Sequence, residues 1–235
     1  MKPVLRTALH VFLLLTIITG CKKKDDDETP PDQEDTWDID TQGIPQFVTT
    51  NYIGLDSIYR ISKFRSSVGH DYSDAFEHCR SMKHYFEPLA TTDWSALEIV
   101  APVAGTITRA DVESMGTKLE IQSDAHPAFR FQIFHIQPAR SFAIGDHVNE
   151  GETLGHHYGN QTYSDIAVLV NDPTKQGRLV SYFDVMSETL FQQYIARGAT
   201  TRDDFIISKA LRDAHPLDCN NFGVGDTLEP WVVLQ

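Results

Sequence analysis

Cysteine and positive charge are scarce in this chain of 235 residues. Its 3 cysteines are too few for the disulfide framework of a small secreted scaffold. Lys+Arg number 20 against 33 Asp+Glu, a formal net charge of −13, so the surface repels polyanions. We therefore expect no nucleic-acid partner and no charge-driven docking on anionic lipid. The chain also lacks a G-x-S-x-G motif, a phosphate-binding glycine loop and an internal repeat.

Long apolar runs are absent except at the N-terminus, where residues 11–18 form one after two basic residues. This run is shorter than the roughly 20 residues of a membrane-spanning helix, and it is typical of a secretory signal over residues 1–20. The segment ITGC that ends at Cys21 resembles the lipobox of bacterial lipoproteins. The resemblance implies lipidation of Cys21 and a bacterial cell-envelope lipoprotein, anchored by its lipid and facing the periplasm or the exterior. The alternative is an ordinary signal peptide with an incidental cysteine.

The rest of the chain divides by composition. Residues 21–45 are charged and proline-bearing, which predicts a lipidated cysteine followed by a disordered tether. Residues 46–235 carry the apolar patterning of a single domain. Because disulfides persist in an oxidising envelope compartment, we expect a bridge between Cys79 and Cys219. The alternative is two buried free thiols.

Apolar and polar residues alternate in several segments of this domain, which is the pattern of half-buried strands. In one of them, we expect His135 to share a face with Phe129 and Ile133. In another, Asp165 lies opposite the apolar face of its strand. The predicted strands are 97–100, 106–108, 118–122, 129–135 and 164–170.

The C-terminal extension, about residues 187–235, has helical rather than strand-like spacing of its apolar residues. Helical spacing predicts one helix over 187–197. A capping box at 201–204 predicts the start of a second helix, which Pro216 ends. The expected fold class is α+β, mainly β, with an antiparallel β-sheet or β-sandwich core and two C-terminal helices.

Four motifs follow one another in the order of a known family: GHDYSD at 69–74, APVAGTI at 101–107, FHI at 134–136 and IGDHVNEGETLG at 144–155. Together they resemble the lysostaphin- or LytM-type zinc metalloendopeptidases, which cut peptidoglycan cross-bridges. The resemblance covers about residues 68–170 and implies a lysostaphin-like fold. An insertion at 75–96 separates the first motif from the second, and we expect it to cover or narrow the groove.

The resemblance also implies site residues. His70 and Asp74 fall on two zinc-ligand positions, and His135 falls on the catalytic position. The family's third ligand belongs to an H-x-H strand, and this chain has no histidine in the corresponding segment at 163–168. Asp165 is one replacement, as ligand or at the catalytic position depending on the register. One histidine of the pair 156–157 is another, because vicinal strand residues point opposite ways.

Three functions remain open. The favoured one is a catalytically degenerate envelope lipoprotein that binds a peptidoglycan peptide or an envelope protein in the former groove. The second is an active zinc metalloendopeptidase with a rearranged third ligand. The third is a structural lipoyl-like β-sandwich module. On the plainer interpretation of the residues, His70 and Asp74 form a hydrogen-bonded turn, and His135 is a half-buried strand-end residue. We also expect Arg80, Lys83 and His84 to form a solvent-exposed or groove-lining face.

Overall fold

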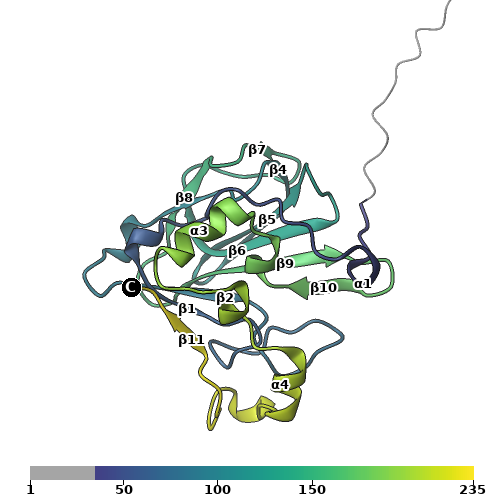
Figure 1. The fold of residues 1–235 in the computed structure, drawn as a ribbon. Coiled ribbons are helices and arrows are strands. Elements are labelled where there is room, and N and C mark those ends of the chain that lie inside the picture. Colours follow the sequence, from purple (N-terminus) through teal and green to yellow (C-terminus); the bar gives the residue numbers. More distant parts are fainter. Residues whose placement is uncertain (1–34) are drawn as a thin grey trace, which may run out of the picture. The chain divides into compact units, whose positions relative to one another are not determined.

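The computed structural model describes residues 35–235, and the expected signal segment and the lipidation of Cys21 lie outside them. Eleven strands form one sheet in the order β11-β1-β2-β9-β6-β5-β4-β7 (Figure 1). β10 pairs with β9, and β8 joins β3 to β6. The strands are β1 (Ile58–Ser62), β2 (His84–Pro88), β3 (Glu98–Val100), β4 (Gly105–Glu113), β5 (Gly116–Ser123), β6 (Phe129–Pro138), β7 (His147–Val148), β8 (Thr153–His157), β9 (Ser164–Asn171), β10 (Gln176–Val180) and β11 (Trp231–Val233).

All pairings between these strands are antiparallel, so the mainly β, α+β prediction is confirmed. Each of the five predicted strands lies within a strand of the structure or overlaps one. Alternation is clearest in β9, where Ile166, Val168 and Val170 are fully buried in the main core. The residues between them face the other side of the sheet, where Ala167 joins a second, smaller apolar cluster. The two faces of one strand thus serve two different environments.

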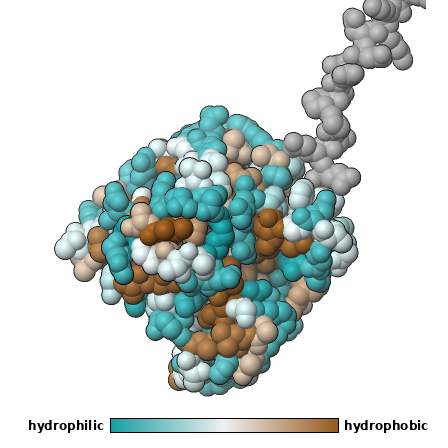
Figure 2. Space-filling model, in the orientation of Figure 1, coloured by the Kyte–Doolittle hydropathy of each residue, from teal (hydrophilic) through white to brown (hydrophobic). Residues whose placement is uncertain are grey.

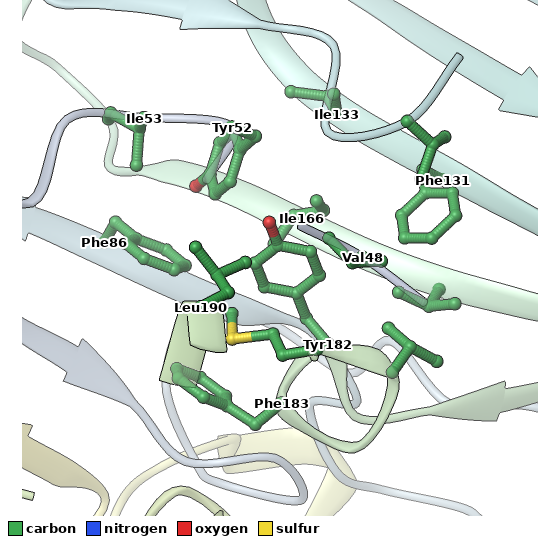
Figure 3. Packing of buried hydrophobic residues seen from close by; sticks show 14 of the residues in the cluster. Val48, Tyr52, Ile53, Phe86, Phe131, Ile133, Ile166, Tyr182, Phe183 and Leu190 are labelled. Carbon is green, nitrogen blue, oxygen red and sulfur yellow. The ribbon is translucent and has the colours of Figure 1, made fainter. Parts of the chain in front are cut away.

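The described residues also form four short helices: α1 (Ile39–Gln42), α2 (Tyr182–Val185), α3 (Glu188–Ile195) and α4 (Lys209–Ala214). The first three contribute buried residues to the main core, whereas α4 buries only Arg212. Figure 3 shows Tyr182 and Phe183 of α2 and Leu190 of α3 packed among buried side chains that include Ile166 of β9 and Phe86 of β2. Each of these side chains is no more than 2% exposed. Burial of a side chain of this size stabilises by roughly 1.5–3 kcal/mol, so this layer fixes the position of the sheet strands.

The first predicted C-terminal helix is confirmed as α3, with Ser187 as its N-cap. The second predicted helix begins later than expected, so the predicted start was wrong. The capping box at Thr201 is present, but it opens a 3-10 turn, Arg202–Phe205, and α4 begins only after Ser208. Between them, Ile206 is extended and its neighbour Ile207 donates its N–H to the carbonyl of Phe64 at 3.0 Å. Pairing with a distant segment therefore overrides the local helical pattern.

Ordered structure begins upstream of the predicted boundary at residue 46. Asp38 caps α1 by accepting hydrogen bonds from two backbone N–H groups, and Ile39 is buried in the core. Asp40 forms ion pairs with Lys175 and Arg178. Ile39 and these ion pairs hold the last part of the expected tether against the domain. Among the described residues, no helix is long and apolar enough to cross a membrane.

The predicted Cys79–Cys219 disulfide is confirmed, and it joins segments 140 residues apart in the sequence. Next to it, Glu77 forms ion pairs with Arg65 and Arg80, and Arg80 also pairs with Asp213 of α4. The disulfide and these ion pairs thereby connect the insertion at 75–96 to the C-terminal segment near α4 (Figure 1).

On the face drawn in Figure 2, hydrophobic residues form several separate patches between hydrophilic ones.

Candidate functional site

A buried lysine lies at the centre of the candidate site. The Lys83 Nζ is 2.7 Å from the Asp165 Oδ2 and 3.5 Å from the His70 Nε2. The other Asp165 oxygen, Oδ1, is 3.1 Å from the His135 Nε2. The structure therefore brings together three of the residues predicted for the site, around a cation that the sequence analysis did not include.

Strand alternation explains how Lys83 reaches this position. Lys83 immediately precedes β2, whose residue Tyr85 pairs with Asp165 of β9. Lys83 and Tyr85 face the site, and His84 between them faces the core. The expectation of a solvent-exposed or groove-lining face was wrong, because Arg80, Lys83 and His84 are only 7%, 3% and 1% exposed. Lysine is rarely buried to this degree without a charged partner, and Asp165 is that partner.

Two aromatic rings also contact the Lys83 ammonium group. The Lys83 Nζ lies 3.8 Å from the ring centroid of Phe134 and 4.3 Å from that of Tyr72. The negative faces of such rings attract a cation, and the attraction grows when water is excluded. The Tyr72 hydroxyl donates to Gln132, which in turn donates to Glu120. Hydrogen bonds to Gln132 of β6, and from it to Glu120 of β5, thus hold the Tyr72 ring in place.

His135 reaches the site through an irregularity in β6. Ile133 pairs with Leu119 and Ile136 with Thr117, so two residues of β6 oppose one residue of β5. This is a β-bulge, a feature that re-aims a side chain. His135 has a backbone φ of 58°, the left-handed region that residues other than glycine seldom adopt. The expectation that His135 shares a face with Ile133 was wrong, because this backbone conformation turns its ring to Asp165 instead.

The electrostatics of the cluster follow from its burial and its charges. Burial alone would raise the pKa of Asp165, but the Lys83 ammonium and His135 hold it below its usual range. Burial alone would lower the pKa of His135, but the Asp165 carboxylate and the Met115 carbonyl raise it. The His135 Nδ1 is 2.9 Å from that carbonyl. Both ring nitrogens of His135 therefore face acceptors, an arrangement that favours its doubly protonated form.

His70 is held by its neighbours in a defined tautomer. Its Nδ1–H donates to the Asp71 carbonyl at 2.9 Å, so Nε2 is the acceptor that faces Lys83. Gly69 before it has a φ of 77°, and a Cβ there would lie 2.2 Å from the Tyr85 hydroxyl. Glycine is therefore required at 69 for the turn and for the close approach of Tyr85.

The remaining predicted ligands lie elsewhere. The Asp74 carboxylate accepts hydrogen bonds from the backbone N–H groups of Phe76, Glu77 and Leu179. Of the vicinal histidine pair, the first is exposed, and the second, His157, is buried and donates to the Gly159 carbonyl at 2.9 Å. Asp74 is thus engaged in a turn and a sheet contact.

These positions do not fit a zinc ion. Catalytic zinc needs three protein ligands and an open fourth position. Within residues 35–235, no group of three His, Cys, Asp or Glu side chains is gathered closely enough to hold a metal. Where Asp165 and His70 converge, the structure has the Lys83 ammonium. No chemistry through a metal follows from this arrangement.

A pocket of about 530 Å³ opens next to the cluster. Its lining combines imidazole, aromatic and amide groups, and the Trp94 and Tyr163 rings lie 5.9 Å apart between centroids. Tyr85 also lines it, and its buried hydroxyl makes no hydrogen bond within the described part of the chain. The lining residues are Gly69, His70, Tyr85, Trp94, His135, Asn160, Gln161, Thr162 and Tyr163. Tyr85 and Trp94 come from the insertion at 75–96, so that segment shapes the pocket.

Comparison with known proteins gives partial similarity at low identity. No protein-family model matches the chain, and no curated protein matches it. A LytM-type protein of Ruminococcus gnavus is similar in structure, with a TM-score of 0.35 and 15% identity. The similarity covers 44% of this chain and 43% of that one, so this chain spans less than half the length of that protein.

Two further solved structures are similar at the same level. The catalytic domain of lysostaphin from Staphylococcus simulans gives a TM-score of 0.35 at 13% identity, covering 51% of this chain and 88% of that one. Pseudoalterin, an M23 metalloprotease from the deep sea, gives 0.36 at 19% identity, covering 57% and 74%.

Proposed function

We propose that this chain is a cell-envelope lipoprotein that uses a peptidase-like fold to bind a peptidoglycan peptide without cleaving it. The observation that carries the proposal is the Lys83–Asp165 ion pair at the centre of the site. A peptidase of the resembled family would need a metal-bound water there, and a buried ammonium supplies none. The pocket beside the ion pair remains available to a ligand.

The chemistry of the pocket supports a peptide as the ligand. The flat rings of Trp94 and Tyr163 offer apolar contact area, and the amides of Asn160 and Gln161 offer hydrogen bonds to peptide groups. The Tyr85 hydroxyl is a buried polar group without a hydrogen-bond partner among residues 35–235, which is costly in a folded protein. A ligand carbonyl or amide would satisfy it.

The test measures binding and cleavage separately. The full chain is mixed with purified peptidoglycan for co-sedimentation, and with a soluble tetrapeptide fragment for titration calorimetry. We expect binding, and we expect no release of peptides with or without a chelator. Tyr85→Phe should weaken binding about 5- to 10-fold, because it removes one hydrogen bond worth about 1 kcal/mol. The same variant should unfold at the wild-type denaturant concentration or higher, because that hydroxyl makes no hydrogen bond to the described residues in the unbound fold.

Trp94→Ala should weaken binding by about tenfold or more, because it removes a ring that contacts the ligand. The matched control is Tyr59→Ala, which removes a ring that is 41% exposed and does not line the pocket. Peptide release that a chelator abolishes would contradict the proposal. So would binding that neither Tyr85→Phe nor Trp94→Ala weakens.

A further inference from the structure

A second cavity, also of about 530 Å³, meets the pocket described above at Trp94 and Asn160. These two residues line both cavities, so the Trp94 side chain borders each of them. The second cavity is formed by the end of the insertion at 75–96 and by the turn that follows β8. The proposed peptide occupies the first cavity and leaves the second without a ligand. The other residues that line the second cavity are Ala90, Thr92, Asp93, Ser95 and Gly159.

The lining of the second cavity favours one class of ligand. Among the described residues that form it, none is Lys, Arg or His, so it offers no positive charge to a phosphate or a carboxylate. Ala90 is its one aliphatic residue, which gives little surface to a large apolar ligand. One broad aromatic ring, that of Trp94, is accompanied by hydroxyl, amide and carboxylate groups. This combination suits a neutral ligand with many hydroxyl groups and one apolar face, which is the make-up of a pyranose sugar.

The Trp94 ring is held in place before any ligand binds. Trp94 begins a 3-10 turn, Trp94–Ala96, and the N-cap Asp93 accepts hydrogen bonds from the Ser95 backbone N–H and hydroxyl at 3.1 and 2.7 Å. The ring lies 6.1 Å from the His157 ring, edge to face, and packs against the main core. A ring that is already ordered loses little entropy when a ligand stacks on it.

Polar groups beside the ring are available to a ligand. Both hydrogen bonds from Ser95 go to one oxygen of Asp93, Oδ1, and the other oxygen accepts none from residues 35–235. The Thr92 side chain likewise has no hydrogen-bond partner in the described part of the chain, and it lines the same cavity. A carboxylate accepts from a sugar hydroxyl, and a threonine hydroxyl both donates and accepts.

We infer that this second cavity is a saccharide subsite, in which the apolar face of one sugar ring stacks on Trp94 and its hydroxyl groups bond to Asp93 and Thr92. The sugar is uncharged, since an anionic one would meet Asp93 with no cation in the lining to compensate. Because the two cavities share Trp94 and Asn160, one ligand that carries a sugar and a peptide can occupy both. The identity of that ligand as peptidoglycan rests on the proposed function, whereas the binding of a saccharide does not.

The experiment titrates the full chain with a peptide-free saccharide, the linear tetramer of N-acetylglucosamine, in a calorimeter. We expect saturable binding of one tetramer per chain, accompanied by a change in tryptophan fluorescence. Trp94→Ala should weaken binding at least about tenfold, because it removes the stacking surface. Asp93→Asn should weaken it about fivefold, because it replaces a charge-assisted hydrogen bond with a neutral one and still provides an N-cap side chain.

The matched control for Asp93→Asn is Asp56→Asn. It also removes an exposed carboxylate from a 3-10 turn, Leu55–Ser57, but Asp56 lines neither cavity, so binding should be unchanged. A sugar-free tetrapeptide is titrated in parallel. Saccharide binding without peptide binding would support the inference and contradict the proposed function. Peptide binding without saccharide binding would overturn the inference and leave the proposed function standing.

Two further results would overturn the inference. One is tetramer binding that neither Trp94→Ala nor Asp93→Asn weakens, at tetramer concentrations up to about 10 mM. The other is a loss of affinity for the sugar-free tetrapeptide in Asp93→Asn that equals its loss for the tetramer, because the second cavity would then belong to the peptide site.

Discussion

The ion pair between Lys83 and Asp165 provides the sharpest test of how the site is built. Their side chains are 3% and 0% exposed, and the charged atoms are 2.7 Å apart. At an effective dielectric constant of about 20, two unit charges at that distance attract by about 6 kcal/mol before the cost of removing them from water. Removal of one partner leaves the other charge buried without compensation, which typically costs 3–5 kcal/mol. We expect Lys83→Met to lower the free energy of unfolding at pH 7 by about that amount.

The loss should depend on pH with a defined sign. In the wild type, the pKa of Asp165 is held low, so its contribution is present above its unfolded value of about 3.9 and is lost as pH falls through the lower folded value. In Lys83→Met, burial raises the pKa of Asp165 instead, and the carboxyl protonates. The difference between the two proteins should therefore be largest near pH 7 and should shrink below about pH 4.

The measurement is urea unfolding of four proteins with the disulfide intact: the wild type, Lys83→Met, Asp165→Asn and the double variant. The double variant should lose at least about 2 kcal/mol less than the sum of the single losses, because it leaves no unpaired charge. A loss under about 1 kcal/mol in Lys83→Met, as for an exposed pair, would refute the reasoning. So would additive losses.

Four further predictions concern the surroundings of the site. Burial lowers the pKa of His84 to about 4, so the stability that its neutral form contributes is complete above about pH 6.5 and is lost as the pH falls. The free energy of unfolding, measured with urea, should decrease by about 2 kcal/mol between pH 7 and pH 5, and by less in His84→Gln. Gly69→Ala should lower the free energy of unfolding by at least about 2 kcal/mol more than Gly43→Ala. Both glycines have a positive φ, but only a Cβ at 69 would clash with a neighbouring side chain, that of Tyr85; equal losses would contradict this. His135→Gly should unfold at higher urea than His135→Ala, the reverse of the usual order, because position 135 has a φ of 58°. Replacement of Cys79 and Cys219 by serine should cost about 2–5 kcal/mol, and alkylation mass spectrometry should find both thiols protected until reduction.

The motifs predicted His70 and His135 of the cluster, and strand alternation predicted the face on which Asp165 lies. It placed Asp165 on the face opposite Ile166 and Val168, and the structure confirms that face. Alternation alone could not predict the orientation of His135, because a bulge with a positive φ reverses it. The sequence carries no marker for such a bulge at a residue other than glycine.

The central lysine could not be found from local sequence. Lys83 precedes a strand in an insertion, and its partner Asp165 lies 82 residues further along the chain. A charged residue at the start of a strand ordinarily indicates exposure, and only the pairing of β2 with β9 reveals burial. The disulfide was predictable because compartment and cysteine number left few pairings. The start of the second C-terminal helix was not predictable, because Ile207 pairs with Phe64, which lies 143 residues earlier in the chain.

The central claim is that an ammonium group takes the place of a metal ion in this fold. Diffraction from crystals of the full chain soaked in zinc, recorded on both sides of the zinc absorption edge, tests it most directly. The account predicts density for the Lys83 side chain reaching Asp165 and no anomalous peak between the His70 Nε2 and the Asp165 Oδ2. An anomalous peak at that position, with Lys83 displaced from Asp165, would contradict it.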